Sequence, residues 1–166
     1  MKLLLFFATF FIASFVYQTG GQRLNCIQSS PSAGATTPSQ SLTGFSDLPG
    51  SAVGKTVGEG AAAQITLDLN AAGHGWYIDP TPLDSSDDFL PTSDVNIWQA
   101  KPGSAAAGKM DMLSVLLHEY GHVLGLDHTA DQHNFMAESL QSGQRKLPTQ
   151  AELTLMAQLT EKIKAA

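Results

Sequence analysis

The stretch that decides the fold is residues 118–128, which read His118-Glu119-Tyr120-Gly121-His122-Val123-Leu124-Gly125-Leu126-Asp127-His128. On a helix, His118 and His122 are one turn apart and project from the same face, about 6 Å apart along the axis. Their imidazoles can therefore reach one tetrahedral metal ion, the geometry that zinc prefers. Gly125 lets the chain leave the helix through a positive φ, so that His128 can return as a third ligand.

Glu119 follows the first of these histidines by one residue. That step rotates its side chain by about 100° from the ligand direction, which suits a carboxylate that contacts a metal-activated water rather than the metal. Three neutral imidazoles leave the fourth zinc position open, as in catalytic sites. Glu119 would then act as general base and pass the proton to the leaving amine. The sequence therefore predicts one catalytic residue, Glu119, and three zinc ligands, His118, His122 and His128.

The full signature, H-E-x-x-H-x-x-G-x-x-H, resembles the metzincin metallopeptidases. Met136 stands eight residues after His128, where metzincins carry the methionine that forms a hydrophobic floor under the imidazoles, the Met-turn. The spacing is similar to the matrixin branch, because the tyrosine found two residues later in other branches is Glu138 here. Residues 68–80 also resemble matrixin-type domains of bacterial secreted proteins. The resemblance covers residues 64–147 and implies a zinc-dependent endopeptidase with protein or peptide substrates.

Length and charge limit the classes of function. A chain of 166 residues is enough for one domain of ordinary size. Its formal net charge is −6, and no cluster of lysines and arginines interrupts the sequence. Both features argue against nucleic acid or an anionic membrane as a partner.

Residues 1–21 are expected to be a signal peptide. Lys2 precedes an apolar run from Leu3 to Val16, which has the length of a signal-peptide core and is too short to span a bilayer comfortably. Thr19 and Gly21 supply small residues before a cleavage site. We therefore expect a secreted, extracellular protein with no stable membrane association after signal removal. An uncleaved anchor is the alternative, because the match to an A-x-A site is poor.

The single cysteine, Cys26, has no partner for an internal disulfide. Matrixin precursors are kept latent by a propeptide cysteine that occupies the open zinc position. Here the residues around Cys26 lack the Pro, Gly and Asp of that motif, so an incidental thiol is the favoured interpretation.

The remaining chain divides into two segments. Residues 22–63 are a low-complexity segment rich in Ser, Thr, Gly, Ala and Pro, and we expect them to be largely irregular. Residues 64–166 are expected to form a matrixin-like metallopeptidase domain. Periodicity predicts strands at 64–69, 76–78 and 95–98, an active-site helix ending at Gly125, and a last helix opened by a Thr149–Glu152 capping box. The expected fold is α+β, with a small twisted mixed β-sheet on the zinc-binding helix, a Met-turn and a C-terminal helix.

This inventory departs from the matrixin pattern, which has five strands and a long helix before the zinc helix. Either further strands lie in the low-complexity segment, or the domain is a minimal or truncated version. The alternative function is therefore a noncatalytic, zinc-stabilised secreted or surface binding module with a degenerate substrate cleft. A gluzincin, with Glu138 or Glu152 as the third ligand in place of His128, is the alternative among enzymes.

Other polar residues are weaker candidates for the site. His74 and His133 are expected to be surface or structural residues, while Asp127 could orient the metal loop through hydrogen bonds. Matrixins often bind Ca²⁺, and an acidic loop could supply oxygens for it. No spaced calcium-loop pattern is present, so a solvated loop is favoured over a calcium site. The carboxylates concerned are Asp79, Asp84, Asp87 and Asp88.

Overall fold

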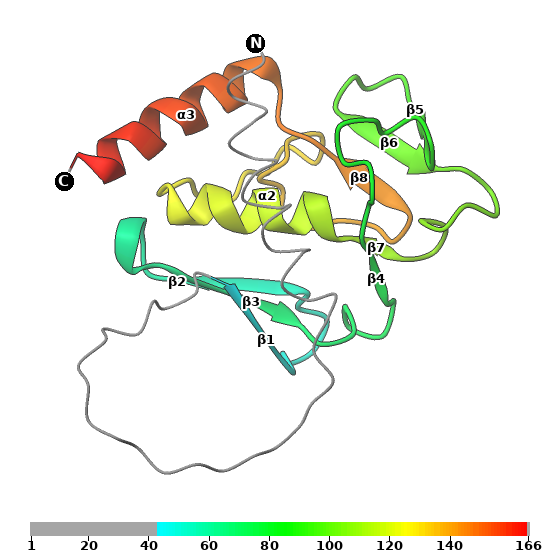
Figure 1. The fold of residues 1–166 in the computed structure, drawn as a ribbon, viewed down its shortest axis with the longest axis horizontal. Helices are drawn as coiled ribbons and strands as arrows, with labels where there is room; N and C mark the ends of the chain where they lie inside the picture. Colours follow the sequence, from blue (N-terminus) through cyan, green and yellow to red (C-terminus); the bar gives the residue numbers. More distant parts are fainter. Residues whose placement is uncertain (1–42, 166) are drawn as a thin grey trace.

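A computed structural model describes residues 43–165 (Figure 1). The expected signal peptide, Cys26 and most of the low-complexity segment lie outside the described residues. Within them, the expected α+β architecture is confirmed. The described strands form three small sheets, and the helix α2 (Met112–Val123) runs through the middle of the domain, with α3 (Gln150–Lys164) beside it (Figure 1).

The first sheet contains β1 (Thr43–Ser46), β2 (Gly54–Val57) and β3 (Gln64–Asp68) in the order β1-β3-β2. β1 runs parallel to β3, whereas β2 runs antiparallel to it and forms one edge. A short 3₁₀ helix, η1 (Gly60–Ala62), connects β2 to β3. The expectation of an irregular segment therefore does not hold for residues 43–63. The alternative expectation, that strands lie within this segment, is confirmed.

The strands β1 and β2 are hard to recognise in the sequence for a physical reason, unlike β3. In β3, Ile65 and Leu67 are buried and give the alternation expected of a half-buried strand. Three of the four residues of β1 are exposed, so this strand carries almost no apolar signal. Its pairing with β3 rests on main-chain hydrogen bonds, which any side chain permits.

The other two sheets lie at the N-terminal end of α2. β4 (Trp76–Tyr77) pairs in parallel with β7 (Met110–Asp111). β5 (Phe89–Pro91), β6 (Ile97–Ala100) and β8 (Gln144–Lys146) form an antiparallel sheet in the order β5-β6-β8. The strand expected at 95–98 begins at Ile97, because Val95 is 85% exposed in the preceding turn.

Two hydrophobic clusters hold α2 in place. One packs Met112, Val115 and Val123 of the helix on Ile65 and Leu67 of β3. The other cluster joins the end of α2 and the segment after it to α3, through Leu124, Phe135, Met136 and Met156. The helix is therefore fixed on both sides, which gives its functional residues a rigid support.

The last helix begins where the sequence predicts. The Thr149 side chain accepts a hydrogen bond from the Glu152 amide, and the Glu152 side chain accepts one from the Thr149 amide, which completes the capping box. Between residues 43 and 111, the structure shows no α-helix before α2. No helix in the described part of the chain is long and apolar enough to cross a membrane.

Candidate metal centre

Helix α2 places two of the predicted ligands. Asp111 caps its N-terminus by accepting a hydrogen bond from the Ser114 amide. His118 and His122 then lie one turn apart, with their ring centroids separated by 4.8 Å. Both side chains are partly exposed, because they face a cavity rather than the core.

The chain turns back immediately after this helix. Gly125 has a φ of 81°, the left-handed conformation that glycine adopts without a Cβ penalty. The amides of Gly125 and Leu126 donate to the carbonyls of His122 and Gly121, which ends the helix in a tight turn. As the sequence predicts, the turn returns His128 to the two helical histidines.

The three imidazoles converge on one point through their Nε2 atoms. The Nε2 atoms of His118 and His128 are 3.1 Å apart, those of His122 and His128 are 3.1 Å apart, and those of His118 and His122 are 3.2 Å apart. No other group of three or more His, Cys, Asp or Glu side chains within residues 43–165 is close enough to hold a metal ion.

Hydrogen bonds to the main chain fix how two of these rings present their lone pairs. Nδ1 of His118 lies 3.0 Å from the carbonyl oxygen of Phe135, and Nδ1 of His122 lies 2.8 Å from that of Leu126. A carbonyl only accepts, so each Nδ1 carries the proton and donates. Burial lowers the pKa of His118 to about 4, which keeps it neutral at pH 7. Its Nε2 lone pair, like that of His122, therefore points at the shared centre.

This arrangement fits a zinc ion. Converging lone pairs repel one another, and a cation bound between them would remove that repulsion. Tetrahedral zinc with Zn–N distances of about 2.0–2.1 Å has nitrogen–nitrogen separations of roughly 3.3–3.4 Å. The separations of 3.1–3.2 Å are within a few tenths of an ångström of that geometry.

Met136 packs against α2 at Gly121, between the positions of the two helical histidines, as the Met-turn resemblance implies. It is buried, and its carbonyl accepts a hydrogen bond from the Thr129 amide, which ties its turn to the residue after His128. A Cβ placed on Gly121 would meet the Met136 sulfur at 2.3 Å. Glycine is therefore needed between the two helical histidines for the methionine to pack against α2.

The Glu119 side chain is held by strand β2. It is only 5% exposed, and its Oε2 accepts a hydrogen bond of 2.6 Å from the Thr56 hydroxyl. A Cβ on Gly54 would meet Oε1 at 2.5 Å, so the strand is shaped around the carboxyl group. Burial raises the pKa of Glu119, and the hydrogen bond from Thr56 partly offsets that rise. A raised pKa suits a group that both accepts and returns a proton.

One cavity of about 800 Å³ contains the three histidines and Glu119. β2 forms part of its rim, since Gly54, Lys55 and Thr56 line it. The wall after the Met-turn is residues 137–140, and Lys146 of β8 also lines the cavity. The site is therefore a hollow between α2, the edge strand β2 and the segment after Met136.

The weaker histidine and acidic candidates do not belong to the metal-ligating group, although His74, Asp127 and Glu138 line the same cavity. His74 and His133 are exposed, as expected, and His133 pairs with Asp94. Asp127 is exposed as well, and the hydrogen bonds that orient His118 and His122 come from main-chain carbonyls instead. The gluzincin alternative needs Glu138 or Glu152 as a ligand. Neither belongs to the histidine cluster, and Glu152 is occupied in capping α3.

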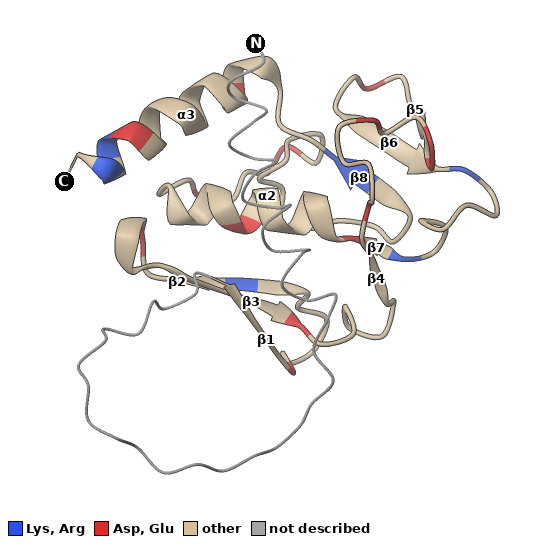
Figure 2. Cartoon of the chain, in the orientation of Figure 1, with Lys and Arg blue, Asp and Glu red and all other residues tan. Residues whose placement is uncertain are grey.

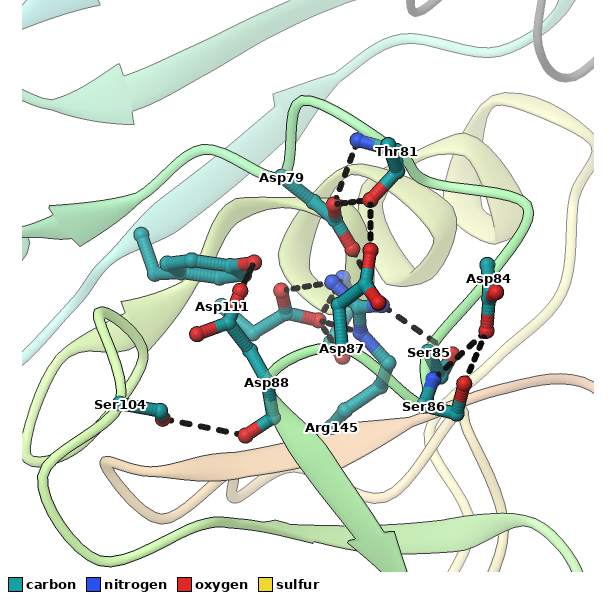
Figure 3. A network of polar contacts seen from close by, with 12 residues as sticks. Asp79, Thr81, Asp84, Ser85, Ser86, Asp87, Asp88, Ser104, Asp111 and Arg145 are labelled. Carbon is teal, nitrogen blue, oxygen red and sulfur yellow. Dashed lines mark hydrogen bonds and ion pairs between the residues drawn. The ribbon is translucent and has the colours of Figure 1, made fainter.

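The acidic loop is organised around Arg145 rather than left free for cations (Figure 3). Nη1 of Arg145 lies 2.7 Å from Asp79, and its Nε and Nη2 form a bidentate pair with Asp111 at 3.0 and 2.8 Å. Each of the other loop carboxylates accepts a hydrogen bond from a nearby residue: Asp84 from Ser86, Asp87 from Thr81 and Asp88 from Tyr77. Calcium binding by this loop, the less favoured interpretation of its sequence, is not tested by these contacts.

Several residues of the site were missed from the sequence. Thr56 and Gly54 lie in the segment expected to be irregular, and Arg145 and Lys146 lie in a three-residue strand. Residues 54–57 give no local apolar signal, because their one large apolar side chain, Val57, is 59% exposed.

Comparison with known families is consistent with this site. A family model described as Matrixin matches residues 53–155, from the start of β2 to the first part of α3. The matched span is more than half of the chain and begins before residue 64, where the domain was expected to begin. The search found no match to a curated protein or to a solved structure.

Proposed function

The chain belongs to the matrixin family of peptidases, and from this premise we propose that it is a secreted, zinc-dependent endopeptidase. The observation that carries the proposal is the convergence of the three Nε2 atoms beside a buried carboxyl group in one cavity. A site built only for stability would gain little from Glu119 in that position, since burying a carboxyl group is costly even with the hydrogen bond from Thr56.

His118, His122 and His128 would hold the zinc ion. Bound there, zinc supplies a Lewis acid that polarises a peptide carbonyl and lowers the pKa of a water molecule. The main-chain carbonyls of Phe135 and Leu126 keep two of the imidazoles in the tautomer and orientation that this requires.

Glu119 would move the proton. Its carboxylate accepts a proton from the attacking water and returns it to the leaving nitrogen. Burial raises the pKa of Glu119, which makes its carboxylate a stronger proton acceptor than an exposed one. The Thr56 hydroxyl holds one carboxyl oxygen, which leaves the other free for the water.

The edge strand β2 offers a place for the substrate backbone. β2 pairs with β3 on one side, and no described strand pairs with its other side. An extended peptide could add to that edge by main-chain hydrogen bonds and pass the cavity that β2 lines. The strand has four residues, so it would bind a short stretch of substrate.

The proposal of secretion rests on the apolar run from Leu3 to Val16. N-terminal sequencing of the protein recovered outside the cells tests it. Protein that stays with the cells and keeps Met1 would contradict export.

The test of catalysis compares zinc content with cleavage of unfolded casein. The zinc-loaded wild type should cleave casein, and a chelator should abolish cleavage. Glu119→Gln should keep one zinc per chain but lose nearly all activity, because the proton acceptor is gone while the three ligands remain. His122→Ala should lose both zinc and activity.

Two outcomes separate this proposal from a noncatalytic, zinc-stabilised binding module. Wild-type turnover by Glu119→Gln would contradict the role of Glu119. One bound zinc per chain without any cleavage would favour the binding module, an alternative to which the short strands of the first sheet also point.

A further inference from the structure

Strand β8 carries two adjacent cations with opposite environments. Figure 2 shows this positive charge on β8. Successive residues of a strand point to opposite faces, and the side chains of Arg145 and Lys146 accordingly contact different partners. Arg145 is fully buried between Asp79 and Asp111, and its guanidinium lies 4.2 Å from the ring centroid of Phe89. Its charge is therefore neutralised within the fold.

Lys146 is nearly as buried, at 4% exposed, yet has no such partner. Its Nζ donates to the carbonyls of Gln132 at 2.7 Å and Ser139 at 3.2 Å. An ammonium group has three donors, so these two contacts leave one. Within residues 43–165, no carboxylate oxygen lies within 4.0 Å of it. Burial without a counter-ion lowers the pKa of Lys146, although Asp131 and Asp94 oppose that shift from further away.

The position of Lys146 relative to the metal centre follows from its other contacts. Its amide donates to the Ser114 hydroxyl at 2.8 Å, and Ser114 lies one turn before His118 on α2. One turn is about 5.4 Å along the axis. From there the side chain crosses to the segment that contains Ser139, on the opposite wall. Lys146 therefore lines the cavity and connects α2 to the segment 137–140.

We propose that Lys146 makes the enzyme select substrates that carry a carboxylate side chain, Glu or Asp, next to the scissile bond. The inference rests on the proposed endopeptidase activity and names the substrate class for it. A side chain that enters the cavity beside the metal runs between Ser114 and residues 137–140 toward the ammonium group. Its carboxylate would take the third Nζ donor and supply the counter-ion that the fold lacks.

The other lysine that lines the cavity provides a matched control. Lys55 lies on β2 and is exposed, so its charge is screened by water. Replacing it should alter the choice of substrate far less than replacing Lys146.

The experiment measures kcat/KM for three peptides that differ only in Glu, Gln or Leu, placed in separate series on either side of the scissile bond. Wild type should prefer Glu over Leu by about tenfold to a hundredfold on one side, since a hydrogen bond between charged groups contributes that much. Lys146→Met should lose this preference, Lys146→Arg should retain part of it, and Lys55→Met should keep it.

Failure of this inference is distinguishable from failure of the proposed function. If wild type cleaves casein but shows no preference for Glu on either side, Lys146 only tethers the loop, and the proposal is wrong. If wild type cleaves nothing, fluorescence polarisation of the labelled peptides on zinc-loaded protein replaces kcat/KM. Equal affinity for the Glu and Leu peptides would then overturn the proposal.

Discussion

Two polar clusters hold the two ends of the same helix, and their polar atoms are satisfied in opposite ways. At the N-terminus of α2, Arg145 and its carboxylates Asp79 and Asp111 are buried and satisfied within the protein (Figure 3). Near the C-terminus, the Nε2 atoms of the three histidines face one another in an open cavity. The first cluster is satisfied within the protein, whereas the second presents three nitrogen ligands that could bind a metal ion.

The difference separates stability from function within one helix. A buried ion pair is costly to break because the remaining charges lose their partner, so the Arg145 cluster should govern the free energy of unfolding. The histidine cluster has little to lose in the metal-free protein and should govern zinc binding and catalysis. The following substitutions test that division, from the largest expected effect to the smallest.

Arg145→Met should give the largest change in stability. It leaves the carboxylates of Asp79 and Asp111 buried without a counter-ion, which costs about 3–5 kcal/mol. Urea unfolding followed by circular dichroism measures the loss. The exposed loop carboxylate Asp84 provides the control, since Asp84→Asn should leave the unfolding curve unchanged.

Zinc content makes this substitution a test of the division between the clusters. The fraction of Arg145→Met that remains folded should still bind one zinc per chain. Loss of zinc with an unchanged unfolding curve would show that the Arg145 cluster serves the metal centre directly.

Gly121→Ala should act mainly on the histidine cluster. The new Cβ would meet the Met136 sulfur at 2.3 Å and an atom of the Phe135 ring at 3.4 Å. Overpacking of this kind costs about 1–3 kcal/mol. Because the Phe135 carbonyl orients His118, the displacement should also weaken zinc binding, by roughly tenfold, as measured by competition with a chromogenic chelator.

A second glycine controls for the added methyl group. A Cβ on Gly44 of β1 would meet nothing within 4 Å, so Gly44→Ala should change neither stability nor zinc affinity measurably. Equal effects of the two substitutions would argue against a specific floor under the imidazoles.

The features that could be predicted from the sequence are those determined by residues close together in the chain. His118, His122 and His128 lie within eleven residues, and helix geometry plus one glycine fixes how they meet. The capping box of α3 spans four residues and is correct to the residue. Local periodicity and capping contain enough information for both features.

The residues that the sequence did not reveal make contacts with residues far away in the chain. Arg145 reaches Asp111 and Asp79 across 34 and 66 residues, and Thr56 reaches Glu119 across 63. Nothing in the neighbouring sequence distinguishes such a threonine from the others of a Ser- and Thr-rich segment. Their partners follow from how β2 and β8 pack on α2, which a single sequence does not encode locally.

Thr56→Val should have the smallest effect on the protein. It separates the contribution of Glu119 to turnover from zinc binding by the histidines. Valine keeps the β-branched shape that the strand favours but removes the hydrogen bond to Glu119. The hydrogen bond that orients the carboxyl group contributes about 1.5 kcal/mol, and its loss corresponds to roughly a tenfold fall in kcat. Zinc content and KM should stay unchanged, because neither the ligands nor the free edge of β2 is altered. Thr56→Ser restores a hydroxyl at the same position and should recover most of the lost kcat. If serine fails to do so, or if KM rises in place of the fall in kcat, Thr56 acts through the shape of β2 and not through the Glu119 carboxyl group.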